Sequence, residues 1–553
     1  MKKKLIKKTS MFLSVLLMTQ ALLTGCGSNN SSGTNVDENG KAVLEVDENG
    51  KVNGIMNAEG LPIVDNKGDY TFSIFVDNST PLEGQFVWPM LEEQTNVQVD
   101  VKSYAYEIAQ EKYGLALSSG DYTDVIGGWC LSSNDILTYG VDMGIFIPLE
   151  DYFEKFAPNI MELLEMPGVR ETMTAPDGHI YAIPYVIDAP KVDFSPYINK
   201  KWLDTLGLEM PTNTEEFREV LRAFKTQDPN GNGKADEIPF SSDPNNRKLG
   251  YLCGWFGLPI ENDGFTMIDG KLEFGANREE YKMMIEYMAS LNAEGLLDPE
   301  FFTQDLATWK GKGNQDLYGV SIAYGSGDFK PFQAGQKPDY EPLPVLSSPQ
   351  CSEPKWLADS YGISTLKNQV VITDKAKNPE VIVRWWDNLY ETDNSFQALN
   401  GPFDITCEKL GEKHYKVFDR SKLDPEVDEK YSWANIFCQS LPKNILKQNI
   451  TVEEVNPAYP EKEIVDELYE PYFVGNDGNG NYTVTPDYWI DPEDAAKLSE
   501  YTVSITDYIK QKTAQWISGQ ADVNAEWDEY CVQLDKLGLQ EYIKIRQEAL
   551  KQK

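Results

Sequence analysis

The sequence predicts an α/β fold built on a mostly parallel sheet. Residues 70–76 alternate apolar and polar side chains, as a half-buried strand does. Patterns typical of a helix, a strand, a second helix and a third strand follow at 87–94, 97–101, 108–117 and 124–126. Strands that alternate with helices favour parallel pairing, with the helices packed on the sheet.

The first 25 residues are predicted to be a targeting segment. Five lysines precede an apolar run at 11–23, which is too short for a comfortable membrane span. The run ends in Leu23-Thr24-Gly25-Cys26, which resembles a bacterial lipobox. Cys26 is therefore expected to become the mature N-terminus and to carry a diacylglyceryl group. The alternative is an ordinary signal peptide that happens to contain a cysteine.

Residues 26–68 are predicted to form a flexible tether behind that cysteine. The segment starts with Ser, Asn and Gly residues and then repeats Val-Asp-Glu-Asn-Gly-Lys at 36–41 and 46–51. Two Asn-Gly turns ten residues apart suggest small hairpins or a spacer rather than a functional repeat. The folded body is expected to start near Asp69.

The charge of the chain excludes one class of partner. Residues 1–25 contain five lysines and no acid, so the remaining chain has 45 basic and 88 acidic residues and a net charge of about −43. Such a surface repels nucleic acid phosphates and anionic lipid headgroups. We expect no nucleic acid partner, and attachment to the membrane through the acyl anchor rather than a basic patch.

An aromatic residue follows the third predicted strand. Gly127-Gly128-Trp129 comes directly after the apolar residues 124–126. The carboxyl ends of strands in an open α/β sheet are where such folds present ligand contacts. Trp129 is therefore a candidate ligand contact, and the alternative is that its ring fills the core.

The stretch Asp228–Glu237 has the pattern of a calcium loop. Oxygen-bearing side chains alternate along it, and Gly233 allows the sharp turn, as in the first half of an EF-hand. The pattern then departs from an EF-hand, because Pro239 stands where the closing glutamate is expected. The predicted Ca²⁺ ligands are Asp228, Asn230, Asn232, the carbonyl of Lys234, Asp236 and Glu237. An ordinary surface turn is the alternative.

A capped helix is predicted before that loop. Thr212 and Glu215 have capping-box spacing, and an apolar stripe runs from Phe217 to Phe224. The whole stretch Asn199–Phe240, NKKWLDTLGLEMPTNTEEFREVLRAFKTQDPNGNGKADEIPF, resembles the extracellular solute-binding proteins of bacterial sugar importers, family 1. It is closest to a long lipoprotein branch in which the loop resembles the calcium site of alginate-binding proteins.

Other stretches carry the same resemblance. Residues 177–185, DGHIYAIPY, resemble a turn and strand of this family, and the residues from Trp516 to Gly538 resemble its C-terminal pattern. The resemblance covers about residues 70 to 550 and is weakest at 401–495.

The resemblance implies a two-lobed, periplasmic-binding-protein-like fold of type II that closes around its ligand by a hinge. The first lobe would take residues 69–188 and 360–430, and the second 189–359 and 431–553. The implied protein is a monomeric, lipid-anchored receptor on the outer face of the cell membrane. It would capture an oligosaccharide and deliver it to the permease subunits of an ABC transporter, with a structural Ca²⁺ and no enzymatic activity.

Sugar recognition calls for aromatic faces and planar hydrogen-bonding groups in a cleft that closes. Side chains of these types near predicted strand ends or crossovers are the candidate ligand contacts: Trp129, Tyr185, Asp188, Trp255, Tyr324, Tyr361 and Trp433.

Residues for catalysis are poorly supplied. The chain has only two histidines, His179 and His414, and contains neither G-x-S-x-G nor G-x-x-x-x-G-K-[ST]. With 88 acids, a pair of catalytic carboxylates cannot be recognised from sequence. Two alternatives stay open: the same fold binding a peptide or another solute, and a surface glycan-active enzyme.

Overall fold

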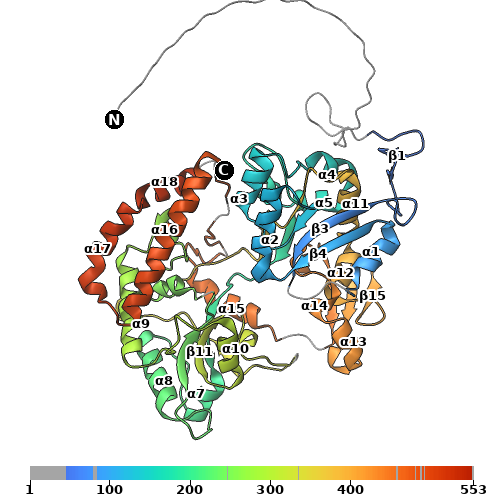
Figure 1. Cartoon of the computed structure of the whole chain (residues 1–553). Helices are drawn as coiled ribbons and strands as arrows, with labels where there is room; N and C mark the ends of the chain where they lie inside the picture. Colours follow the sequence, from blue (N-terminus) through green and yellow to red (C-terminus); the bar gives the residue numbers. More distant parts are fainter. Residues whose placement is uncertain are drawn as a thin grey trace, which may run out of the picture.

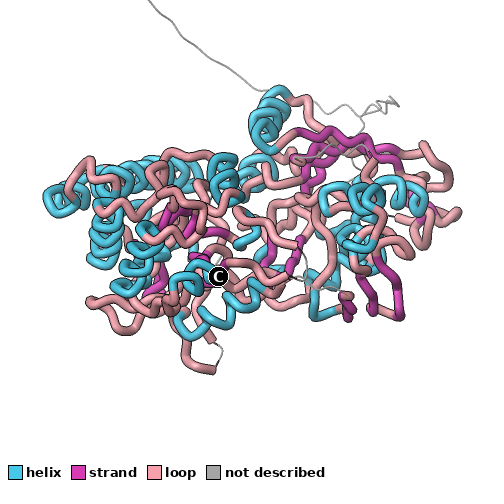
Figure 2. Tube along the Cα trace, turned by 90° about the horizontal axis from the view of Figure 1, so that it is seen from below, coloured by secondary structure: helices cyan, strands magenta, loops and turns pink. Residues whose placement is uncertain are grey.

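The computed structural model describes residues 45–550 except 79–83, 246, 334–335, 456–458, 480, 486–487 and 491. Cys26, the targeting segment and the first part of the expected tether lie outside the described residues. The described chain forms two lobes that lie side by side (Figure 1), and in both lobes helices surround the strands (Figure 2). The predicted two-lobed α/β architecture is confirmed.

The first lobe is built on a four-stranded sheet in the order β14-β5-β3-β4. Its strands are β3 (Thr71–Asp77), β4 (Gln98–Tyr104), β5 (Val125–Gly127) and β14 (Val370–Ile372). β3 pairs in parallel with β4 and β5, whereas β14 is antiparallel to β5. The predicted strand–helix order is therefore confirmed, with boundaries shifted by a few residues.

The helices of the first lobe come from two parts of the chain. They are α1 (Val87–Thr95), α2 (Tyr106–Ser119), α3 (Ser133–Asp135), η1 (Ile136–Asp142), α4 (Glu150–Phe156), α5 (Pro158–Leu164), α6 (Val169–Met173), α11 (Pro379–Leu389), α12 (Thr392–Asn400), α13 (Pro425–Lys430) and α14 (Trp433–Ile436). Trp385 and Trp386 of α11 are fully buried, as their helical spacing predicts.

The second lobe is built on a mixed sheet in the order β12-β7-β11-β8. Its strands are β7 (Ser195–Asn199), β8 (Ile238–Ser242), β11 (Tyr318–Ala323) and β12 (Tyr340–Pro342), with a separate hairpin of β9 (Phe265–Ile268) and β10 (Lys271–Phe274). β8 and β11 are parallel, and β7 is antiparallel to both of its neighbours.

The helices around the second sheet are also drawn from separate segments. They are α7 (Lys200–Leu206), α8 (Thr214–Thr226), η2 (Leu249–Phe256), α9 (Glu279–Ala293), α10 (Leu306–Asn314), η3 (Ser326–Asp328), α15 (Glu461–Tyr469), η6 (Glu470–Tyr472), α16 (Pro492–Ile517), α17 (Val523–Lys536) and α18 (Leu539–Leu550).

The cap of α8 is shifted by one residue from the sequence prediction. Asn213, not Thr212, is the N-cap, and its Oδ1 accepts hydrogen bonds from the backbone N–H groups of Glu215 and Glu216. The hydroxyl and the N–H of Thr212 instead donate to the carboxylate of Glu216. Thr and Asn both cap well, and spacing alone does not choose between neighbours.

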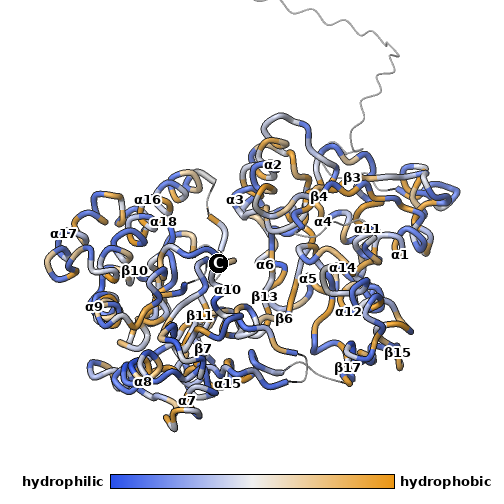
Figure 3. The backbone as a smooth tube through the Cα atoms, turned by 60° about the horizontal axis from the view of Figure 1, so that its bottom comes forward, coloured by the Kyte–Doolittle hydropathy of each residue, from blue (hydrophilic) through white to orange (hydrophobic). Residues whose placement is uncertain are grey.

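Two paired strands run between the lobes (Figure 3). β6 (Tyr185–Asp188) and β13 (Ile363–Leu366) are antiparallel, with Asp188 opposite Ile363 and Tyr185 opposite Leu366. The chain passes between the lobes a third time between Leu446 of the first core and Val465 of the second.

Each lobe has its own apolar core. The second core contains residues from 192–358 and from 465–542. The first contains residues from 52–186 and from 370–446, so it extends past both limits expected from the sequence, 69 and 430. At the first limit, the hairpin of β1 (Lys51–Val52) and β2 (Met56–Asn57) is tied to α11, since Arg384 donates to the carbonyls of Asn57 and Gly60.

The first lobe extends beyond residue 430 because the chain after α14 packs back on the first sheet. Ile436, Phe437 and Leu441 are buried there, and the Ser440 hydroxyl donates to the carbonyl of Asp77 at 2.8 Å. A small sheet of β15 (Cys407–Gly411), β16 (His414–Val417) and β17 (Thr451–Glu454) flanks this region, with η4 (Arg420–Lys422) and η5 (Lys447–Asn449) beside it.

Candidate functional site

The carboxyl edge of the first sheet presents an exposed aromatic ring. β3, β4 and β5 are parallel, so their ends share an edge, and Trp129 follows β5 there with 48% of its surface exposed. Gly128 has a φ of +118°, and a Cβ there would lie 2.1 Å from Oδ1 of Asp77. Only glycine fits this turn, which leaves Trp129 at the edge rather than in the core.

A buried carboxyl group lies beside this turn. Asp77 ends β3 and is 2% exposed. Burial raises the pKa of Asp77, while nearby N–H groups of Trp129 and Cys130 and the Ser440 hydroxyl oppose the rise. Asp77 was not predicted from the sequence, although an acid that ends an alternating strand is a signal that could have identified it.

The corresponding edge of the second sheet carries Tyr324. Tyr324 follows β11 and is 42% exposed, and Ala323 pairs with Ser195 at the start of the antiparallel β7. Phe194, which precedes β7, contacts the Tyr324 ring edge-on at 5.9 Å between centroids. The Lys462 Nζ lies 3.9 Å from the centroid of the same ring. One aromatic face is thus covered by a cation from α15.

The helix α15 also fixes the backbone of the first crossover, residues 189–194 between β6 and β7, where the chain first passes between the lobes. The Lys462 Nζ donates to the carbonyl of Val192 at 3.0 Å and to that of Asp193. One turn further on, the carboxylate of Asp466 accepts from the N–H groups of Lys191 and Val192, both at 3.0 Å. Burial lowers the pKa of Lys462 to about 8, against the carboxylates of Asp193 and Asp466.

Tyr251 joins three ionisable groups behind this crossover, and the first is Lys248, whose Nζ donates to the Tyr251 hydroxyl at 3.1 Å. Its hydroxyl lies 2.6 Å from Oδ1 of Asp359 and 2.9 Å from Oε2 of Glu261. A hydroxyl has one proton, so it can donate to only one of the two and must accept from the other. Burial raises the pKa of Glu261 to about 7, so below that pH a protonated Glu261 can supply the second hydrogen bond.

The crossover enters the same network through Asp193. Its backbone N–H donates to Oδ2 of Asp359 at 2.9 Å. Burial, together with the charge of Asp359, raises the pKa of Asp193 to about 6. Lys248 supplies a cation, since its Nζ lies 3.5 Å from Oδ1 of Asp359. The second edge is therefore a charged, internally hydrogen-bonded surface.

The other predicted ligand residues are scattered. Tyr361, just before β13, is 64% exposed and pairs with the Tyr482 ring at 5.3 Å. Tyr185 on β6 is half-buried, and burial raises its pKa to about 12. Asp188 is exposed and accepts from the N–H of Lys447 at 2.8 Å. In this pair of strands Tyr361 lies just beyond the end that carries Asp188, and Tyr185 lies at the opposite end.

The two remaining residues that were predicted to contact the ligand are Trp255 and Trp433. Trp255 is 1% exposed and packs edge-on against Phe217 and Tyr287, so the prediction of a ligand contact there is wrong. Its run of apolar neighbours in η2 fits a core position better. Trp433 begins α14, and its side chain lies outside the described part of the structure.

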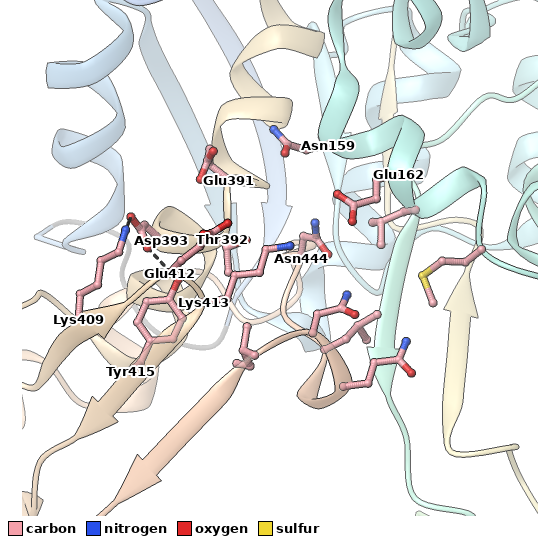
Figure 4. A pocket seen from close by; sticks show the side chains of 16 residues that line it. Asn159, Glu162, Glu391, Thr392, Asp393, Lys409, Glu412, Lys413, Tyr415 and Asn444 are labelled. Atoms are coloured by element: carbon pink, nitrogen blue, oxygen red, sulfur yellow. Dashed lines mark hydrogen bonds and ion pairs between the residues drawn. The ribbon is translucent and has the colours of Figure 1, made fainter.

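A polar cavity of about 420 Å³ lies elsewhere on the first lobe, between α5, α12 and the β15–β16 hairpin (Figure 4). Asp393 at its side accepts a hydrogen bond from the Tyr415 hydroxyl at 2.8 Å and pairs with Lys409. None of the predicted ligand residues lines it. It is therefore separate from the sheet edges.

The stretch Asp228–Glu237 folds as a tight loop of side chain-to-backbone hydrogen bonds. Asp228 has a φ of 46°, and its carboxylate accepts from the N–H groups of Asn232 and Gly233. The amide groups of Asn230 and Asn232 point to Oδ1 of Asp236, at 3.4 and 3.0 Å. Among the described residues, no three acidic, cysteine or histidine side chains converge as a metal-binding group.

One oxygen of this loop lacks a partner. Oε1 of Glu237 is buried without a hydrogen bond in the structure. Burial, reinforced by the charges of Asp228 and Asp236, raises the pKa of Glu237. A hard cation would satisfy a buried oxygen near other acidic groups, so this one feature of the loop fits a calcium ligand.

Comparison with known proteins identifies the relatives of this chain. No family model matches. The fructooligosaccharide ABC transporter substrate-binding protein FusA of Streptococcus pneumoniae is 31% identical over 584 aligned positions, which cover 99% of this chain and 98% of FusA. None of the described helices is long and apolar enough to cross a bilayer.

Solved structures agree. An EF-hand mutant of S. pneumoniae FusA in complex with fructo-nystose superposes with a TM-score of 0.75 at 29% identity, over 87% of this chain and 99% of that one. An HMO-binding solute-binding protein of Bifidobacterium longum infantis has a TM-score of 0.73 at 25% identity, over 87% and 98%. With FusA matched along nearly its whole length and the same two-lobed fold, this chain belongs to the substrate-binding proteins of ABC transporters.

Proposed function

We propose that this protein binds an oligosaccharide between its lobes and delivers it to the permease of an ABC importer. The observation that carries the proposal is the pair of exposed rings, Trp129 and Tyr324, on the carboxyl edges of the two sheets. Aromatic faces suit the CH surfaces of sugars, and a closing cleft buries both. FusA, whose name gives fructooligosaccharide as its ligand, supports the same class.

A thermal-shift screen over oligosaccharides tests this proposal. A ligand that binds only the folded protein raises its melting temperature, by RT ln(1 + [L]/Kd) in free energy. We expect at least one oligosaccharide to raise the Tm, and kestose and nystose are the first probes. A rise with peptides and none with any oligosaccharide would instead support a different solute on the same fold.

The protein is proposed to bind its ligand unchanged rather than to act on it. Asp359 and Glu261 share the Tyr251 hydroxyl, and Asp193 is hydrogen-bonded to Asp359, so these acids hold the structure of the second edge. Chromatography of a bound oligosaccharide after prolonged incubation should recover it intact. Shortened products that disappear when Asp359 is replaced would identify a glycan-active enzyme.

We infer that Cys26 anchors the protein, as a monomer, to the outer face of the membrane. The lipobox and the lysine-rich start support this, and the name of the relative Lipoprotein LipO of Bacillus subtilis, 27% identical over 43% of this chain, agrees with it. Cys26→Ala should release the protein from the membrane fraction or leave it unprocessed. Normally processed, membrane-bound mutant protein would contradict the anchor.

We also propose that Ca²⁺ binds Asp228, Asn230, Asn232, the Lys234 carbonyl, Asp236 and Glu237, and that its role is structural. The unpartnered oxygen of Glu237 and the EF-hand of the solved FusA mutant support it. The ion would relieve repulsion among three carboxylates and link α8 to β8 through the loop between them.

Chelation tests the calcium proposal. At free calcium about 100-fold above Kd, the ion would stabilise the fold by about 2.7 kcal/mol, and chelator should lower the Tm accordingly. Asp228→Ala should abolish this dependence, while ligand affinity stays nearly intact. Asp477→Ala is the matched control, because Asp477 also accepts hydrogen bonds within an Asn/Gly-rich turn. An unmoved melting curve in metal-free wild-type protein would leave the loop a simple turn.

A further inference from the structure

A cavity of about 520 Å³ opens in the second lobe between η2, the loop before β9 and the helix α16. Pockets for small ligands commonly measure about 300–1,000 Å³. Its lining combines apolar side chains such as Ile260 and Phe302 with the hydroxyls of Thr502 and Thr506 on one face of α16. This mixture matches a sugar, which has both CH surfaces and hydroxyl groups.

The cavity adjoins the proposed binding edge. Asn245 and Arg247 in its wall follow β8, whose carboxyl end lies beside that of β11, the strand that leads to Tyr324. Glu261 in its wall is hydrogen-bonded to Tyr251, which contacts Asp359 just before Tyr361. The helix α16 also approaches η1 of the first lobe. The cavity therefore continues the surface marked by Tyr324 and Tyr361.

Arg247 offers a flat donor to a ligand in this space. Its Nε donates to the carbonyl of Phe301 at 3.0 Å, which fixes the plane of the guanidinium. The guanidinium lies 5.8 Å from the centroid of the Phe302 ring. A fixed guanidinium beside an aromatic ring can donate to neighbouring hydroxyls while the ring contacts the sugar face.

Charges around the cavity are balanced. Burial lowers the pKa of Arg247, and the nearby carboxylate of Asp243 opposes this lowering. Asp263 in the wall is paired with Arg546 of α18. The remaining cation and acid of the lining are Lys510 and Glu261. These residues include as many carboxyl groups as cations, so when Glu261 is ionised the described lining gives no net attraction for an anionic ligand.

We infer that this cavity is an end subsite that holds the terminal part of an uncharged oligosaccharide, so that affinity increases with chain length. The inference rests on the proposed function and adds to it the charge class of the ligand and a length requirement. Short sugars would occupy only the aromatic edges, and longer ones would reach Arg247.

Calorimetric titration with series of defined length tests the subsite. The neutral probes are sucrose, kestose and nystose, and maltose, maltotriose and maltotetraose; the charged probes are di-, tri- and tetragalacturonate. For wild-type protein we expect at least one neutral series to gain about tenfold in affinity or more from disaccharide to tetrasaccharide. The galacturonates should bind more weakly at every length.

Two variants locate the effect. Ala514→Phe fills the cavity and should remove the gain with length, while the disaccharide binds as before. Val503→Phe is the matched control, because Val503 lies on the same helix, is 57% exposed and does not line the cavity. Arg247→Gln is the second variant and should weaken tetrasaccharide binding about tenfold without changing disaccharide binding.

The outcomes separate this inference from the proposed function. Neutral binding that is independent of length, unchanged tetrasaccharide affinity in Arg247→Gln, or tighter binding of the galacturonates overturns the subsite alone. Absence of binding by both neutral series and by the whole thermal-shift panel overturns the proposed function and the subsite with it.

Discussion

The carboxyl edges of the two sheets are built in opposite ways. The first edge presents Trp129 on a glycine turn, with the buried Asp77 beside the turn. The second edge presents Tyr324 beneath the ammonium of Lys462, in a network that also fixes the backbone of the crossover. The first edge is mainly an aromatic surface. At the second edge, charged side chains hydrogen-bond to one another and to the backbone of residues 191–193, where the chain crosses between the lobes.

Because of this difference, we expect the two edges to contribute differently to ligand affinity and to the stability of the fold. A half-exposed ring such as Trp129 contributes little to the folded state and is free to contact a ligand. The groups around Tyr324 stabilise the second lobe whether or not a ligand is present, because they satisfy backbone groups of the crossover. Substitutions at the first edge should therefore alter affinity alone, whereas substitutions at the second should alter both.

The largest effect is expected at Trp255, which was predicted as a ligand contact and lies in the core. Trp255→Ala should lower the free energy of unfolding by about 3–5 kcal/mol, because it empties a fully packed site. Urea unfolding measures this. Trp129→Ala is the matched control and should change the free energy of unfolding by less than about 1 kcal/mol. Equal losses of unfolding free energy in the two variants would contradict the placement of Trp255 in the core and Trp129 at the edge.

Asp466→Ala comes next and tests the anchor of the crossover. The substitution leaves two backbone N–H groups without their carboxylate acceptor and should lower the free energy of unfolding by about 2–3 kcal/mol. Hydrogen exchange at the amides of Lys191 and Val192 should become faster. Unchanged exchange at both amides would show that α15 does not hold the crossover.

The pH dependence of stability gives a smaller test of the second edge. Asp193, with a pKa raised to about 6, keeps a proton that the unfolded chain has already released. The free energy of unfolding therefore falls as pH rises from about 4 to about 6. Asp193→Asn should remove this part of the slope, about 1–2 kcal/mol after allowance for its partial exposure.

Asp305 provides the opposite case for comparison. Its pKa is lowered by hydrogen bonds from Thr308, so its contribution to stability is present above the pKa of the unfolded chain and is lost as pH falls through the folded one. Asp305→Asn should therefore remove a slope of the other sign. Urea unfolding from about pH 2 to pH 7 measures both variants, and slopes of one sign for both would contradict the assignment.

Sequence patterns predicted the architecture well where periodicity is strong. The order of strands and helices at 70–126 was predicted because alternating and helical spacings are distinct there. The exposed turn at Gly127-Gly128-Trp129 was predicted from the place of two glycines after an apolar strand. These features depend on neighbouring residues, which a sequence displays directly.

Features that depend on distant contacts were not predicted. The patterns of Trp129 and Trp255 both allow an exposed ring, and only packing against Phe217 and Tyr287 shows that Trp255 is buried. Lys462 and Asp466 have the spacing of an ordinary surface helix, so their bonds to the crossover leave no signal in the sequence. The small sheet of β15, β16 and β17 pairs strands that are separated by a long, weakly patterned segment.

The most direct test of the account is calorimetric titration of the oligosaccharide that raises the Tm most into wild-type protein, Trp129→Ala and Tyr324→Ala. If that sugar lies between the two edges, each substitution should weaken binding by about 10- to 100-fold, since a central aromatic contact contributes about 2 kcal/mol or more. Trp129→Ala should do so with an unchanged melting temperature in the absence of ligand. Wild-type affinity in both variants would contradict binding of an oligosaccharide between the lobes.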